Sequence, residues 1–317
     1  MIAFAFRRMF GSAVVLAAVS VLTFLIFEAI PNGDPALRMA GQNATPDTIA
    51  AIRRAWGFDH PIWRQYLTMM RKIFDGSVIS YSDQANVVQQ IRRGLPATIS
   101  LAIGAMVLLA LISVTVGTIS AARAGRVTDR ILTVGSLVGF STPPYVVGAL
   151  ILYIFGYSLH ILPTAGYVGI TAHPWAWFTH LLLPWIALAI PVSGASARIL
   201  RASLLENIHE DFVRTAKAKG LSRTRVMIRH VLRTSLIPLV SLWGLDFAAL
   251  LGGGAILIET IFNLHGVGQY AAGSVQALDV PPILVITMYG AFAVVVFSAL
   301  VDILYAVLDP RIRLTTG

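Results

Sequence analysis

Six long apolar runs organise this chain, and nearly all of its charged residues lie in the segments between them. A helix needs about 20 residues to cross a hydrocarbon layer of about 30 Å, because each residue adds about 1.5 Å. The runs meet or approach that length and predict six membrane spans. The predicted spans are residues 9–30, 97–119, 132–156, 181–197, 236–258 and 284–307. Pro184 and Pro191 predict a kink in the fourth span.

The composition supports a membrane protein. Only 12% of the 317 residues are charged and 56% are hydrophobic, whereas a soluble domain carries about 25% charged residues. That supply of charge is too small to cover a soluble core. The net charge of +9 alone could suggest nucleic acid, but the bases lie between apolar runs. We therefore expect an all-α membrane protein that binds no nucleic acid.

The first apolar run is expected to remain as a span rather than act as a cleaved secretory signal. It follows Arg7 and Arg8, as a signal core would. However, its roughly 18 apolar residues exceed the ~7–15 of a signal core. The sequence Glu28-Ala29-Ile30-Pro31 also lacks a small-residue cleavage pattern.

The distribution of bases predicts which side of the membrane each connection faces. With residues 1–8 in the cytoplasm, the four inside segments carry two, three, nine and two bases, while external segments 157–180 and 259–283 carry none. The other eight bases lie in the external segment 31–96, which is long enough to translocate with little regard to charge. Both termini, including the tail 308–317, are therefore expected in the cytoplasm.

The external segment 31–96 predicts small amphipathic helices. Thr45 before Pro46 indicates an N-cap, Gly57 a stop, and Pro61 a second start. In the second helix, the apolar residues recur at helical spacing: Trp63, Tyr66, Leu67 and Met70. A third stretch, residues 84–93, leads into the second span. The segment is either a cap packed on the bundle or a docking surface for an external partner.

No catalytic or metal-binding motif is evident. The chain has no cysteine, and its seven histidines form neither a His-Glu-x-x-His motif nor an i, i+4 pair. Gly252-Gly253-Gly254 lacks the Gly-Lys of a phosphate-binding loop. We therefore expect no catalytic residue, metal or cofactor in this chain. Gly252 and Gly253 are interpreted as close-packing residues, with a pore-lining role as the alternative.

Two carboxylates lie within predicted spans, where charge is costly and often functional. Asp246 lies about ten residues into the fifth span and is a candidate for a hydrated pathway. Asp302 lies near the inner end of the sixth span and is interpreted as an interfacial anchor. Glu28 and Glu259 lie near the predicted outer surface and are given no special role.

The inside segment 198–235 predicts a short, stiff helix on the membrane face. Asp211 places an acid at a helix start, whereas Lys217 and Lys219 place bases before the break at Gly220. The alternative is a basic loop resting on anionic lipid. That alternative explains the charge but not the helix, glycine, helix pattern that leads to the next span.

The stretch from Phe212 to Ser222, with Leu236-Ile237-Pro238 beyond it, resembles the cytoplasmic loop of ABC importer permeases of the dipeptide, oligopeptide and nickel type. That loop reads Glu-Ala-Ala, three residues, then Gly. Here Arg214 replaces the glutamate, so any salt bridge of that glutamate is in doubt. Further resemblances, in order along the chain, are residues 30–35, 56–66, 95–98, 162–167, 259–268 and 308–313.

The resemblance implies the first, B-type permease subunit of a type I ABC importer in a bacterial plasma membrane. It implies a second, homologous permease, two cytoplasmic ATPase subunits that use ATP and Mg²⁺, an external substrate-binding protein and contact with membrane lipid. Residues 97–307 would form the permease core. The residues expected to couple to the ATPases are Glu210, Asp211, Arg214, Thr215, Ala216, Lys217, Gly220 and Leu221. Asp246, Gly252 and Gly253 are the pathway candidates.

Two other classes of protein fit the sequence less well. An ion-coupled secondary transporter usually has repeated halves and several buried carboxylates, and neither is evident here. A membrane enzyme needs polar groups clustered at one depth. The resemblance leaves the substrate open among dipeptides, longer peptides, glutathione, nickel complexes and haem-like solutes.

Overall fold

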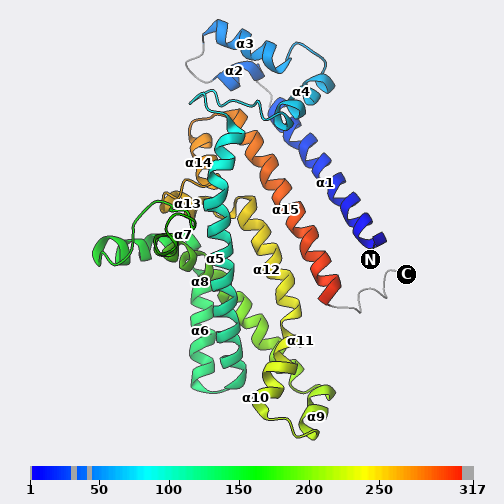
Figure 1. The fold of residues 1–317 in the computed structure, drawn as a ribbon, viewed down its shortest axis with the longest axis vertical. Helices are drawn as coiled ribbons and strands as arrows, with labels where there is room; N and C mark the ends of the chain where they lie inside the picture. The colour runs from blue at the N-terminus through cyan, green and yellow to red at the C-terminus, as the bar shows by residue number, and fades with distance from the viewer. Residues whose placement is uncertain (1, 30–33, 41–44, 309–317) are drawn as a thin grey trace. The chain divides into compact units, whose positions relative to one another are not determined.

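The computed structural model describes residues 2–29, 34–40 and 45–308, which are mostly helical (Figure 1). Among these residues, the only β-type pairing is an isolated bridge between Ile79 and Asn86. The chain divides into two compact units. The first comprises Met1–Ile99 and Ala248–Ala299, and the second comprises Ser100–Phe247 and Leu300–Gly317.

The described helices confirm the predicted all-α membrane fold. Five helices are long and apolar enough to cross a membrane, and one bent pair of helices is a sixth candidate. The five lie in α1 (Ile2–Ala29), α5 (Val87–Ala122), α8 (Pro174–Asn207), α12 with η3 (Ile237–Ala249 and Leu250–Gly254) and α15 (Val280–Leu308). The stretch predicted at 84–93 is mostly part of α5, which runs on through Pro96.

The helix predicted as one span over 132–156 is broken. It consists of α6 (Val127–Ser141), α7 (Pro144–Ile151) and the π-helix η1 (Leu152–Ser158). The two halves are bent by 99°. Consecutive prolines explain the break, because Thr142 and Pro143 each precede a proline and adopt extended backbone. By contrast, α8 is assigned as one helix that includes Pro184 and Pro191, and the kink predicted there stays a prediction.

In the first unit, small helices share a core with the long ones. They are α2 (Pro35–Ala40), α3 (Pro46–Trp56), α4 (Ile62–Phe74) and α14 (Val267–Gln276), and α13 (Ile256–Ile261) packs against α14. The predicted caps of α3 are confirmed: Thr45 accepts from the Thr48 N–H, and Gly57 is left-handed with φ +70°. Trp56 and Met69 are buried in one cluster with Leu284 of α15. The segment after α1 is therefore packed on the long helices of its own unit.

Asp279 fastens the loop before α5 to the C-terminal part of the same unit. Its buried carboxylate accepts hydrogen bonds from the hydroxyls of Ser80 and Ser82 and from the Ser82 N–H. Residues almost 200 positions apart are thus joined by one side chain. The loop is held by charge-assisted hydrogen bonds.

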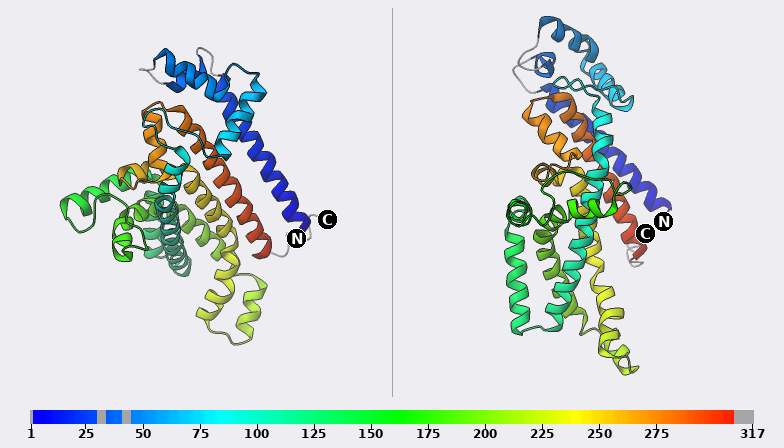
Figure 2. Two further views of the ribbon diagram at one scale, coloured as in Figure 1. Left: turned by 45° about the horizontal axis from the view of Figure 1, so that its top comes forward. Right: turned by 60° about the vertical axis from the view of Figure 1, so that its left-hand side comes forward.

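In the second unit, α8 is the central helix, with α6 and α7 packed on it (Figure 2). Glycines allow the close approach: a Cβ on Gly194 would lie 2.2 Å from the Ser136 carbonyl oxygen, and one on Gly104 would overlap the Trp185 indole. Beyond α8 come α9 (Asp211–Ala218), α10 (Arg223–Val226), η2 (Met227–Leu232) and α11 (Arg233–Ser235).

Candidate functional site

Helix α9 is the short helix that the sequence predicts in segment 198–235. It begins after Glu210, has Asp211 in its first turn and Lys217 in its last. It ends where Gly220 adopts φ +76°. The Gly220 N–H bonds to the Lys217 carbonyl at 2.9 Å, and the Leu221 N–H bonds to the Ala216 carbonyl at 3.3 Å. This left-handed glycine cap fixes where α9 stops.

One face of α9 packs against the rest of the second unit. Val213 is fully buried and Ala216 is 6% exposed. Both belong to an apolar cluster that includes Leu200 and Leu204 of α8 and Val231 of η2. We call this cluster the α9 seat. Ala216 therefore points into the protein, so its contribution is to hold α9 in place.

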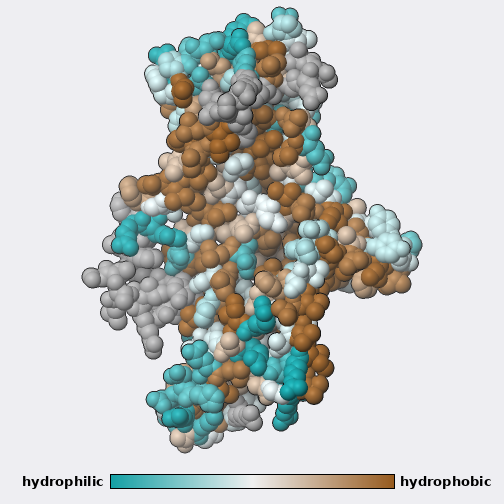
Figure 3. Space-filling view, turned by 180° about the vertical axis from the view of Figure 1, so that it is seen from behind, coloured by the Kyte–Doolittle hydropathy of each residue, from teal (hydrophilic) through white to brown (hydrophobic). Residues whose placement is uncertain are grey.

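The opposite face of α9 is polar and exposed (Figure 3). Asp211 and Arg214 form an i, i+3 ion pair at 3.5 Å with side chains 94% and 78% exposed. The other exposed candidates are Glu210, Thr215, Lys217 and Gly220, and Leu221 is half-buried. Sequence reasoning missed Phe212, an aromatic side chain that is 38% exposed at the start of α9.

Two polar contacts fix the end of α8 from which α9 departs. Arg201 of α8 holds Asp129 of α6 through two hydrogen bonds of 2.7 and 2.8 Å. Asp129 also accepts from the Ser120 hydroxyl and the Gly125 N–H. Farther along α8, the Asn207 amide donates to the Ser235 hydroxyl of α11 at 3.0 Å. The helices around the α9 seat are thus tied together by side chains as well as by apolar packing.

The pathway candidates lie in different units. Asp246 of α12 belongs to the second unit and is half-buried, and the described residues provide it with no hydrogen bond or ion pair. Asp302, in the same unit, is also half-buried. Gly252 and Gly253 belong to the first unit. The side chain of Glu28 lies outside the described residues.

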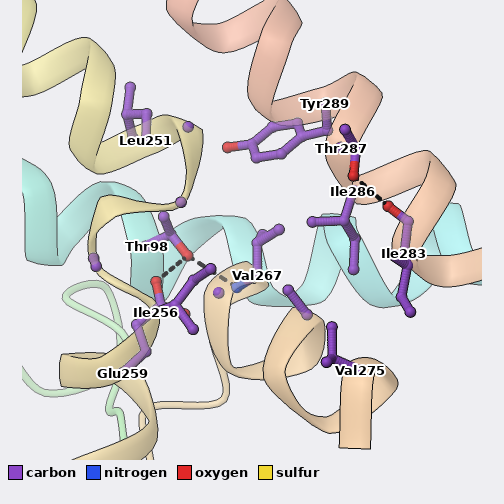
Figure 4. Close-up of a pocket in the computed structure, with 15 residues that line it drawn as sticks. Thr98, Leu251, Ile256, Glu259, Val267, Val275, Ile283, Ile286, Thr287 and Tyr289 are labelled. Atoms are coloured by element: carbon purple, nitrogen blue, oxygen red, sulfur yellow. Dashed lines mark hydrogen bonds between the residues drawn. The ribbon is translucent and has the colours of Figure 1, made fainter. Parts of the chain in front are cut away.

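Gly252 and Gly253 lie next to close helix contacts and also line a cavity. A Cβ on Gly252 would lie 2.6 Å from Val294, and one on Gly290 would lie 2.6 Å from the Gly252 carbonyl oxygen. Gly253 adopts φ +123°, which breaks the helix. Both glycines also line a cavity of about 280 Å³ together with Thr98, Glu259 and Tyr289 (Figure 4). These contacts agree with the close-packing interpretation, and the pore-lining role of the two glycines stays a prediction.

Glu259 corrects the expectation that it needs no special role. It is fully buried, and its carboxylate accepts from the Thr98 hydroxyl at 2.7 Å (Figure 4). It also accepts from the Gln269 N–H at 2.9 Å. It therefore caps α14. Burial raises the pKa of Glu259, and the hydrogen bonds from Thr98 and the backbone oppose that rise. Gly266 and Gly268 leave room for the carboxylate; their spacing after Glu259 was the available sequence signal.

Comparison with known proteins gives the same assignment over nearly the whole chain. The family of binding-protein-dependent transport system inner membrane components matches residues 113–314, and the family for the N-terminal part of such membrane components matches residues 1–102. A probable peptide ABC transporter permease of Sinorhizobium fredii is 34% identical over 97% of this chain and 98% of its own length. The dipeptide transport system permease of Lactococcus lactis is 33% identical over 99% and 100%. The glutathione transport system permease of Escherichia coli is 33% identical over 99% of both chains.

These helices and matches define an integral inner-membrane permease. The chain belongs to the family of binding-protein-dependent transport system inner membrane components, and it is a permease subunit of an ABC importer with the type I fold.

Proposed function

We propose that this permease forms half of a translocation pathway for small peptides and that α9 couples the pathway to separate ATPase subunits. The observation that carries the proposal is the two-sided character of α9. Its apolar side is buried in the α9 seat, while its polar side is exposed and available to a partner. A helix held this firmly transmits a displacement to α8.

The proposed orientation places both termini and α9 in the cytoplasm. It is supported by the excess of bases in segment 198–235 and their absence from segments 157–180 and 259–283. In this orientation, α9 faces the compartment that holds ATP. The partners are a second permease, two ATPase subunits and an external substrate-binding protein, and the ATPases use the ATP and Mg²⁺.

The proposed substrate class is small peptides. The matched relatives are named for peptide, dipeptide and glutathione transport, and glutathione is itself a tripeptide. Asp246 and the glycines Gly252 and Gly253 are proposed to line the pathway. A carboxylate that no described group neutralises can attract the amino end of a peptide.

The test replaces Gly220 by arginine in the complete importer, reconstituted in liposomes with its binding protein. The added side chain meets open space, but the backbone at φ +76° is strained. ATP hydrolysis is expected to continue while peptide uptake per ATP falls. The matched control is Gly166→Arg, which carries the same kind of strain at φ +94°, also in open space, but lies away from α9. Normal uptake per ATP in Gly220→Arg, or an equal loss in Gly166→Arg, would contradict coupling through α9.

The ion-coupled alternative has its own readout. The permease pair is reconstituted without ATPase subunits, and peptide uptake is measured with an imposed proton gradient. The proposal expects no uptake above that of empty liposomes. Uptake driven by the gradient would establish a secondary transporter instead.

A further inference from the structure

Helix α4 carries an exposed apolar stripe that its own unit leaves uncovered. Trp63, Leu67 and Phe74 are 59%, 55% and 81% exposed. They lie at positions i, i+4 and i+11, which fall within about 40° of one another around a helix of 3.6 residues per turn. A single exposed apolar residue is ordinary, but three in line on one short helix form a surface with a partner.

The remaining faces of α4 show how that stripe is oriented. Gln65 and Met69 are buried and face the core of the first unit. On the other side of the stripe lie Arg64 and Arg71. The Arg64 guanidinium sits 5.0 Å from the centre of the Trp63 ring, and Arg71 also forms an exposed ion pair with Asp75 at 3.3 Å. The order around α4 is thus protein core, apolar stripe, basic face.

Contacts with α1 fix the depth of α4. The Tyr66 hydroxyl bonds to the Ser20 hydroxyl at 2.7 Å, and the Tyr66 and Phe24 rings meet edge to face at 5.6 Å. Ser20 and Phe24 lie in the C-terminal half of α1, nine and five residues before its end at Ala29. At about 1.5 Å per residue they are about 14 and 8 Å from that end. Helix α4 therefore lies beside the last turns of a membrane span.

We propose that α4 is an interfacial helix whose occupant is the lipid bilayer. Trp63, Leu67 and Phe74 enter the boundary between headgroups and acyl chains, where tryptophan is enriched and amphipathic helices lie. Arg64 and Arg71 reach the phosphates of anionic lipids, since arginine keeps its charge at the interface while its stem covers apolar surface.

The bilayer fits better than a water-soluble protein partner. The stripe lies on a helix that contacts the C-terminal half of α1, where Leu22 and Ile26 are 58% and 59% exposed. Lipid covers exposed apolar side chains of a membrane span, and a bilayer that covers them extends directly onto the stripe. Because α4 shares its core with Trp56, lipid contact at α4 also fixes the depth of α3.

Single cysteines test this proposal cleanly, because the chain has none of its own. Leu67→Cys and Phe74→Cys are spin-labelled in the full importer, with cysteine-free partners, in nanodiscs of phosphatidylethanolamine and phosphatidylglycerol. Depth is read from collisions with oxygen and with a water-soluble nickel chelate. The references are Val14→Cys on α1, expected deep in lipid, and Ala55→Cys on the exposed side of α3, expected in water.

Labels at 67 and 74 are expected at depths between the two references, with or without the binding protein. In Leu67→Cys, a larger phosphatidylglycerol fraction is expected to deepen the label, and adding Arg64→Gln and Arg71→Gln is expected to abolish that shift. Chelate access equal to that at position 55 overturns the proposal, as does protection that appears only when the binding protein is added. The readout is independent of transport, so it stands or falls separately from the proposed coupling.

Discussion

Asp129 and Glu259, two buried carboxylates from different units, are compensated in different ways. Asp129 is 3% exposed and is held by Arg201, a full positive charge. Glu259 is fully buried and is held by the Thr98 hydroxyl and backbone N–H groups, with no ion pair among the described residues. The first arrangement neutralises a charge, whereas the second only solvates it.

The difference shows which site depends on protonation. An arginine stays charged at any relevant pH, so the Asp129 contact favours the ionised acid throughout. Neutral donors compensate a buried charge less completely, and burial therefore raises the pKa of Glu259. The Asp129–Arg201 contact beside the α9 seat is thus expected to keep its strength as pH changes. The strength of the Glu259 cap of α14 is expected to depend on pH.

Glu259→Gln is expected to have the largest effect. The Thr98 hydroxyl accepts from the Val267 N–H and donates to Glu259. A glutamine amide must place its NH₂ group toward either that donor or the backbone donors. A mismatched buried hydrogen bond costs about 1–3 kcal/mol. Apparent unfolding free energy in detergent measures the loss, with Glu206→Gln at an exposed position of α8 as the control. Equal stability of the two variants would show that Glu259 does not cap α14.

Arg201→Met is expected to have a smaller effect. Asp129 retains the Ser120 hydroxyl and the Gly125 N–H, and the Arg201 side chain is 30% exposed, so water can replace it. The apparent melting temperature should fall by about 2–4 °C. The melting temperature of Arg201→Lys should lie between those of the parent and Arg201→Met, because lysine restores the charge without the paired hydrogen bonds. A lysine variant as unstable as the methionine variant would mean that charge contributes little here.

The pH dependence separates the two carboxylates further. Because the pKa of Glu259 is higher in the folded protein, its stabilising proton is present below the ordinary value of 4.5 and is lost as pH rises through the folded pKa. The stability gap between the parent and Glu259→Gln should therefore narrow with rising pH, by less than about 1.4 kcal/mol per pH unit. The gap between the parent and Arg201→Met should stay constant over that window. A constant gap for Glu259→Gln would contradict the raised pKa.

The sequence predicts the helices well because their signals are local. Apolar runs, the Thr45 cap and the Gly220 stop each depend on residues within a few positions, and each lies where it was expected. The break at Pro143 and Pro144 has an equally local signal, because a residue before proline favours extended backbone. The length and hydropathy of the apolar run do not carry that signal.

The buried carboxylates could not be predicted in the same way because their partners are distant. Glu259 meets Thr98, 161 positions away, and Asp129 meets Arg201, 72 positions away. The hydropathy pattern predicts that Glu259 lies near the outer surface. It carries no information on α14, which packs over Glu259 in the fold. The direction in which Ala216 faces is likewise set by packing with α8, which the loop motif alone does not specify.

Asp211→Asn completes the comparison with the smallest expected effect. Asp211 and Arg214 have the same chemistry as Asp129 and Arg201, but their side chains are 94% and 78% exposed. Water and salt screen such a pair, so the stability change should stay below about 0.5 kcal/mol in denaturation measurements. Transport per ATP should nevertheless fall if this face meets the ATPase, because the change removes charge from the contact. Asp47→Asn removes an exposed acid from the first turn of α3 in the same way and serves as the control. A clear stability loss in Asp211→Asn would show that charge, rather than burial, decides the strength of these contacts.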